Sequence, residues 1–66
     1  MALAMVEAFD VLMERRTCDL TITLELDRLY NEIFLRVLDL KENAHHVTQI
    51  ASECAMDAFY HPFCYV

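Results

Sequence analysis

The sequence of 66 residues contains no glycine, no tryptophan and a single proline. Without glycine there are no glycine-rich phosphate-binding loops and no collagen-like repeats. Basic residues are also scarce, five against eleven acidic ones, so the formal net charge is −6. Nucleic-acid binding through bulk positive charge is therefore not expected. Charged residues interrupt every apolar run before it is long enough to span a bilayer, so we expect no membrane association.

Hydrophobic residues make up 58% of the chain, which excludes intrinsic disorder. The length allows one small domain, residues 1–66. A core of this size rarely supplies more than about 3–5 kcal/mol of stability. Small chains commonly compensate by association, so we expect a homodimer.

The three cysteines, Cys18, Cys54 and Cys64, are an odd number and do not form a disulfide framework by themselves. The first residues are apolar, but they lack the basic segment that begins a secretory signal peptide. We therefore expect a reduced, cytoplasmic protein.

Apolar residues recur at spacings of three and four in three segments, which predicts amphipathic helices over residues 2–16, 26–40 and 44–60. In the second segment the apolar stripe comprises Leu26, Leu29, Tyr30, Ile33, Phe34, Val37, Leu38 and Leu40. In the third it comprises Ala44, Val47, Ile50, Ala51, Cys54, Ala55, Ala58 and Phe59, and His61–Pro62 ends the helix.

Residues 18–25 are ambiguous, because apolar and polar residues alternate there and the segment contains β-branched Thr and Ile. Locally this pattern slightly favours a short strand over a continued helix. Since a chain with no glycine and one proline offers few turns, we predict a mainly α fold, a small bundle of three amphipathic helices that dimerises. The alternative places a short strand at 18–25 after an N-terminal helix.

Residues suited to catalysis or metal binding do not occur at useful spacings. His61 and Cys64 are near Cys54 in sequence, but the usual paired zinc-ligand spacings are missing. Glu42 and His45 have the i, i+3 spacing of carboxylate-bridged di-iron sites without the further carboxylates those sites need. Cys18 lacks a catalytic context. We expect no metal, no cofactor and no enzymatic activity.

Two groups of residues suggest protein binding instead. The helical spacing of Glu7, Asp10 and Glu14 places three carboxylates on one face, which suits a basic partner or plain solvent. The C-terminal segment is rich in aromatic residues of the kind that anchor interfaces, namely Phe59, Tyr60, Phe63 and Tyr65. The same tail can instead fold back over the core. We therefore expect a small acidic regulatory or inhibitory protein that occludes the surface of an unidentified protein partner.

The order of a short alternating stretch, Leu-Thr-Ile-Thr-Leu at residues 20–24, then two helical segments separated by a polar turn resembles ribbon-helix-helix transcriptional repressors over residues 18–60. The resemblance implies a dimer whose paired strands enter the DNA major groove. Thr21 and Thr23 would then face DNA, with Arg15 and Arg16 close by. A DNA-binding repressor or antitoxin is therefore the alternative function.

Overall fold

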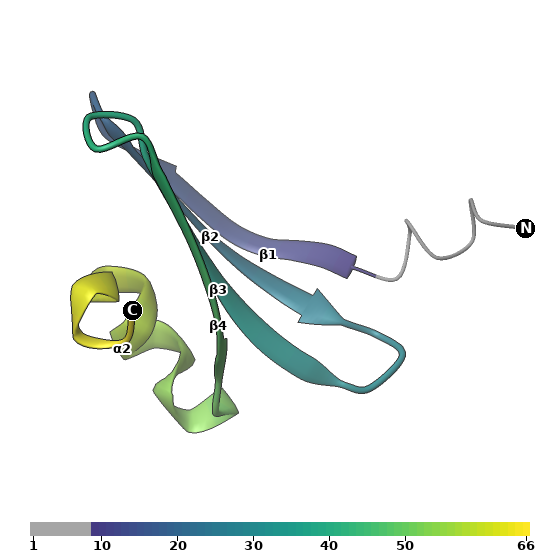
Figure 1. The fold of residues 1–66 in the computed structure, drawn as a ribbon. Helices are drawn as coiled ribbons and strands as arrows, with labels where there is room; N and C mark the ends of the chain where they lie inside the picture. Colours follow the sequence, from purple (N-terminus) through teal and green to yellow (C-terminus); the bar gives the residue numbers. More distant parts are fainter. Residues whose placement is uncertain (1–8) are drawn as a thin grey trace, which may run out of the picture.

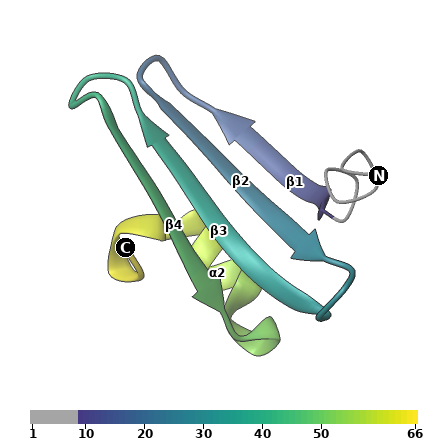
Figure 2. The same ribbon diagram turned by 45° about the vertical axis from the view of Figure 1, so that its right-hand side comes forward.

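The computed structural model describes residues 9–66 and consists of one four-stranded antiparallel sheet with short helical segments on one side (Figure 1). The strands β1 (Phe9–Arg16), β2 (Leu20–Asp27), β3 (Glu32–Asp39) and β4 (Ala44–Ile50) lie side by side in sequence order. Three short helices follow, the 3₁₀ helix η1 (Ser52–Cys54), the α-helix α2 (Ala55–Tyr60) and the 3₁₀ helix η2 (Pro62–Cys64). Figure 2 shows β1 and β4 as the two edges of the sheet, with the helical segments behind it.

The prediction of a mainly α three-helix bundle is wrong. Residues 26–40, predicted to be a helix, contain the end of β2, a turn and β3. Leu29 and Tyr30, which the helical pattern placed on the apolar face, are exposed in that turn. Leu35, which the pattern omitted, is completely buried. The segment from residue 33 to 38 is apolar except for Arg36 and is compatible with a strand as well as with a helical period, and pairing with two neighbouring strands decides between them.

The other two predicted helices are corrected in the same way. Of residues 2–16, the first seven lie outside the described residues and 9–16 form β1. Residues 44–50 form β4, so only 55–60 of the predicted helix 44–60 are α-helical. That helix does end at Tyr60, before His61–Pro62. The ribbon-helix-helix architecture is also wrong, because strands occupy 32–39 and 44–50 where it requires two helices.

The local strand signal at 18–25 coincides with most of β2. Ile22 and Leu24 are buried and Leu20 is half-buried against the core, on the face that carries the helical segments. Thr21 and Thr23 alternate with them on the opposite face. The period-two pattern thus identifies correctly which side chains of this strand point inward.

Asparagine takes the role of the missing glycine in the two turns that connect β2 to β3 and β3 to β4. Asn31 and Asn43 have φ angles of 56° and 52°, in the left-handed region that asparagine tolerates better than most residues. Each turn also begins with an aspartate whose carboxylate accepts a backbone N–H, Asp27 from Leu29 and Asp39 from Glu42. Two matching Asp-x-x-x-Asn turns therefore connect the strands without glycine. The lack of glycine had been the reason to expect few turns and a helical bundle.

We expect Asn43→Val to lower the free energy of unfolding by about 1–2 kcal/mol, because a β-branched residue is strained at positive φ. Asn43→Gly should leave stability unchanged or raise it. Urea denaturation monitored by circular dichroism measures both changes. Lys41→Val, in the same exposed turn, is the matched control and should have little effect. Equal losses at positions 41 and 43 would contradict the role of the left-handed conformation.

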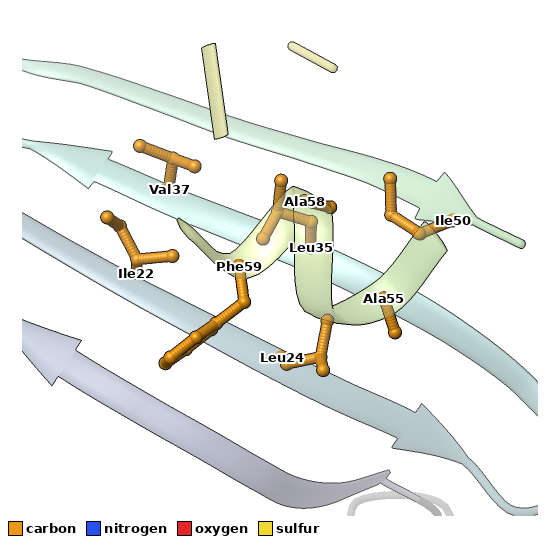
Figure 3. Close-up of a cluster of buried hydrophobic side chains, with 8 residues drawn as sticks. All are labelled: Ile22, Leu24, Leu35, Val37, Ile50, Ala55, Ala58 and Phe59. Atoms are coloured by element: carbon orange, nitrogen blue, oxygen red, sulfur yellow. The ribbon is translucent and has the colours of Figure 1, made fainter. Parts of the chain in front are cut away.

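The core lies between the sheet and α2 (Figure 3). It consists of the buried side chains Ile22, Leu24, Leu35, Val37, Ile50, Ala55, Ala58 and Phe59. The two alanines present only methyl groups to the sheet, so α2 can lie close over β2 and β3. Phe59 is the largest of the three buried side chains of α2. All of this apolar surface lies on one face of the sheet.

Arg15 connects the edge strand β1 to the end of α2. Its guanidinium donates hydrogen bonds to the backbone oxygen of Phe59 from Nε at 3.1 Å and from Nη2 at 3.0 Å, and to that of Tyr60 at 3.4 Å. It also lies 5.6 Å from the centre of each of the two aromatic rings. A cation at this position satisfies terminal carbonyl groups and suits the negative end of the helix.

Candidate functional site

The face of the sheet opposite α2 is left uncovered by the described residues. The register of the strands places on it Phe9, Val11, Glu14 and Arg16 from β1, Thr21, Thr23, Glu25 and Asp27 from β2, Glu32, Phe34, Arg36 and Leu38 from β3, and His45, Val47 and Gln49 from β4. We call this set the open face. Figure 1 shows the helical segments confined to the other side of the sheet.

A polar network occupies the centre of the open face. Arg36 donates to both carboxylate oxygens of Glu25, at 2.8 Å from Nε and 3.2 Å from Nη2. Its Nη1 lies 3.0 Å from Nε2 of His45 on β4, which accepts when that nitrogen carries no proton. The pKa of the Arg36 guanidinium is raised, chiefly by the hydrogen bond to Glu25, against a smaller opposing effect of burial. The network fixes side chains of three strands in one arrangement.

Apolar side chains surround this network. The rings of Phe9 and Phe34 meet edge to face, with centroids 6.2 Å apart, and so reach across β2 from β1 and β3. Val11, Leu38 and Val47 are exposed. Soluble domains expose single hydrophobic residues routinely, but several on one uncovered face are typical of a contact surface. The open face is therefore the candidate interaction surface.

The acidic line predicted from helical spacing is not assembled by the described residues. Glu7 lies outside them. Asp10 and Glu14 are on β1, and the register shift between Val11 and Met13 leaves them on opposite faces of the sheet. Asp10 pairs with Arg28 at 3.2 Å, and Glu14 with Arg16 at 3.6 Å. Of Asp10 and Glu14, it is Glu14 that lies on the open face.

The four residues implicated in DNA binding are divided between the two faces. Arg15 points toward α2 and is engaged there. Arg16, Thr21 and Thr23 are on the open face, but Thr23 is only 7% exposed beneath its neighbours. The structure therefore brings together Arg16 and Thr21, which are directly opposite each other on β1 and β2.

The aromatic tail is likewise divided. Phe59 is buried in the core, whereas Tyr60 and Phe63 are exposed. Tyr65 packs against the core, and its hydroxyl donates to Oδ2 of Asp57 at 2.6 Å. That hydrogen bond is the main reason that the pKa of Tyr65 is raised, with smaller contributions from burial and from the negative charge of Asp57. The tail thus folds over its own sheet through Phe59 and Tyr65.

A pocket of about 350 Å³ lies between the tail and the sheet. Its lining comprises Arg15, Leu20, Ile22, Tyr60, His61, Pro62, Phe63 and Cys64. The lining is mostly apolar, and the Arg15 guanidinium is its main charged group.

Residues suited to metal binding do not cluster in the part of the chain that the structure describes. Between residues 9 and 66, no three His, Cys, Asp or Glu side chains lie close enough together to hold a metal ion. Cys18, Cys54 and Cys64 are free thiols. None of the helices in the same range is long and apolar enough to cross a membrane.

Comparison with known proteins adds no assignment, since no family model, curated protein or solved structure matches the chain.

Sequence reasoning missed most of the open face, because a face exists only once strands pair. The available signal was the repeated Asp-x-x-x-Asn at residues 27–31 and 39–43, the first of which follows the alternating apolar residues of 20–26. That spacing marks two hairpin turns, from which the pairing of β2, β3 and β4 follows.

Proposed function

We propose that this protein is a small acidic regulatory protein that acts by binding another protein and occluding its surface through the open face. The observation that carries the proposal is the exposure of Phe9, Val11, Leu38 and Val47 on a face that residues 9–66 leave uncovered. Removing these side chains from water would favour association by roughly 25 cal/mol for each Å² of apolar surface covered.

The charges of the open face indicate a basic partner. Glu25 and Arg36 neutralise each other, and Glu14 is paired with Arg16. Within residues 9–66, Glu32 has no cation at ion-pair distance and accepts a hydrogen bond only from the neutral side chain of Gln49, whereas Asp27 is buried. The protein as a whole carries a net charge of −6. A partner surface with apolar side chains and Lys or Arg near its rim would be complementary, and long-range attraction would speed its approach.

Val11→Lys tests this proposal, because Val11 is 63% exposed on the open face and the change adds repulsion toward a basic partner. Met56→Lys is the matched control, at 52% exposure on α2. Each protein is immobilised and exposed to extract of its native host. We expect a protein retained by the wild type and by Met56→Lys, and about tenfold less retained by Val11→Lys.

Retention that is equal for Val11→Lys and the wild type would contradict use of the open face. A duplex DNA probe tests the alternative of a DNA-binding repressor in the same preparations. A strongly salt-dependent shift of that probe would favour the alternative and contradict protein occlusion.

A further inference from the structure

The two edge strands of the sheet differ in how well they are protected against pairing with another strand. β1 carries a register shift at Leu12 and four charged residues among its eight, Asp10, Glu14, Arg15 and Arg16. Bulges and charges of this kind are the usual protection of a sheet edge. β4 has the sequence AHHVTQI, with no Asp, Glu, Lys, Arg or Pro, and pairs with β3 without a register shift.

The outer edge of β4 also has no backbone partner among the described residues. Alternate residues of a strand direct their N–H and C=O groups away from the neighbouring strand, so half of the backbone groups of β4 point away from β3. Among residues 9–66, no other segment forms a backbone hydrogen bond with β4. The contacts of helix α2 with the sheet are mainly with β2 and β3.

We propose that β4 pairs with β4 of a second copy of this chain, in antiparallel orientation about a two-fold axis at Val47, to form one continuous eight-stranded sheet. The proposal concerns an edge and does not rest on the function assigned to the open face. The axis is perpendicular to the sheet, so the two open faces would be on the same side and form one surface of double width.

Geometry selects the register. In an antiparallel pair, residues opposite each other must both direct their backbone groups toward the partner or both away from it. When β4 pairs with itself, the two-fold axis must therefore pass between two copies of the same residue, and it cannot lie midway between two successive residues. Of the possible centres, Val47 is the middle of β4, so only this register pairs the complete strand, Ala44 with Ile50.

The side chains that meet in this register are compatible. Val47 contacts Val47 of the second copy on the open face. His45 is opposite Gln49 and His46 is opposite Thr48, so no histidine is opposite another histidine. A register centred at His46 would instead place two imidazoles against each other. Pairing of β4 with β1 of another copy would be heterologous and would lead to open-ended filaments, which the charges and the bulge of β1 oppose.

The association of the wild type, Val47→Lys and Val11→Lys, measured by sedimentation equilibrium at micromolar concentrations, tests this proposal. Val47 is 49% exposed, so lysine is compatible with the folded chain, but two lysines would face each other at the axis. We expect Val47→Lys to raise the dimer dissociation constant by about tenfold or more. Val11→Lys, the same change on the other edge strand, should leave that constant unchanged. Circular dichroism confirms that each variant is folded.

A mixture of Val47→Lys and Val47→Glu tests the register itself. Each variant alone should be weakened relative to the wild type, whereas the mixture should form heterodimers, because lysine and glutamate then meet at the axis. A monomeric wild type, equal weakening by Val11→Lys and Val47→Lys, or a mixture no tighter than the separate variants would overturn the proposal. A lost partner interaction in Val11→Lys with an intact dimer distinguishes this proposal from that for the open face.

Discussion

Phe59→Ala is expected to unfold the protein at room temperature. Phe59 is 3% exposed and is the largest side chain that α2 contributes to the core. Truncating a buried phenylalanine to alanine costs about 3–5 kcal/mol through lost burial and the cavity left behind. A domain of this length has roughly that much stability in total. Circular dichroism and thermal denaturation should therefore show loss of the cooperative transition.

Phe63→Ala is the matched control for this prediction. It makes the same chemical change four residues later, at an exposed aromatic side chain. We expect its effect on the free energy of unfolding to remain within about 0.5 kcal/mol. The pair separates two interpretations of the aromatic tail. If Phe59 were an interface anchor, Phe59→Ala would keep the wild-type melting temperature and lose only association, and the assignment of Phe59 to the core would be wrong.

Arg15→Ala is expected to lower the free energy of unfolding by about 2 kcal/mol, which is a large part of the stability of so small a domain. The substitution removes hydrogen bonds to the carbonyl groups of Phe59 and Tyr60 and the contacts with both rings. Hydrogen bonds that involve a charged group are worth about 1.5–3 kcal/mol, and partial exposure of this one reduces its value. Urea denaturation measures the loss.

Arg16→Ala provides the comparison, because the two arginines are adjacent on β1 and face opposite sides of the sheet. The Arg16 side chain is 72% exposed, and its one ion pair within the described residues is with Glu14 at 3.6 Å. Exposed ion pairs contribute about 0–1 kcal/mol, so Arg16→Ala should have a small effect. The loss of stability in Arg15→Lys should lie between those of Arg15→Ala and the wild type, because lysine keeps the positive charge but lacks the planar set of donors. Equal losses in Arg15→Ala and Arg16→Ala would contradict the link between β1 and α2.

Part of the candidate site follows from local sequence, and part does not. The alternation in β2 correctly separates the inward Ile22 and Leu24 from the outward Thr21 and Thr23. No comparable inference was possible for Glu25, Arg36 and His45, which are far apart in sequence and meet only because β2, β3 and β4 pair in one register. The prediction that Glu7, Asp10 and Glu14 share one face used local sequence alone, and the described residues Asp10 and Glu14 do not support it. The common face depended on helical periodicity, and β1 is a strand with a register shift.

The sequence by itself determined the properties that depend on composition and on immediate neighbours. These are the net charge of −6, the end of a helix before Pro62, and the inward and outward sides of β2. Tertiary structure decided that residues 32–39 and 44–50 are strands. The pattern of residues 32–39 fits a strand as well as a helix, and the three-residue spacing of Ala44, Val47 and Ile50 favours a helix, so the backbone hydrogen bonds between paired strands decide in both cases. Asn31 and Asn43 make the required turns without glycine, since asparagine tolerates the left-handed conformation that those turns impose.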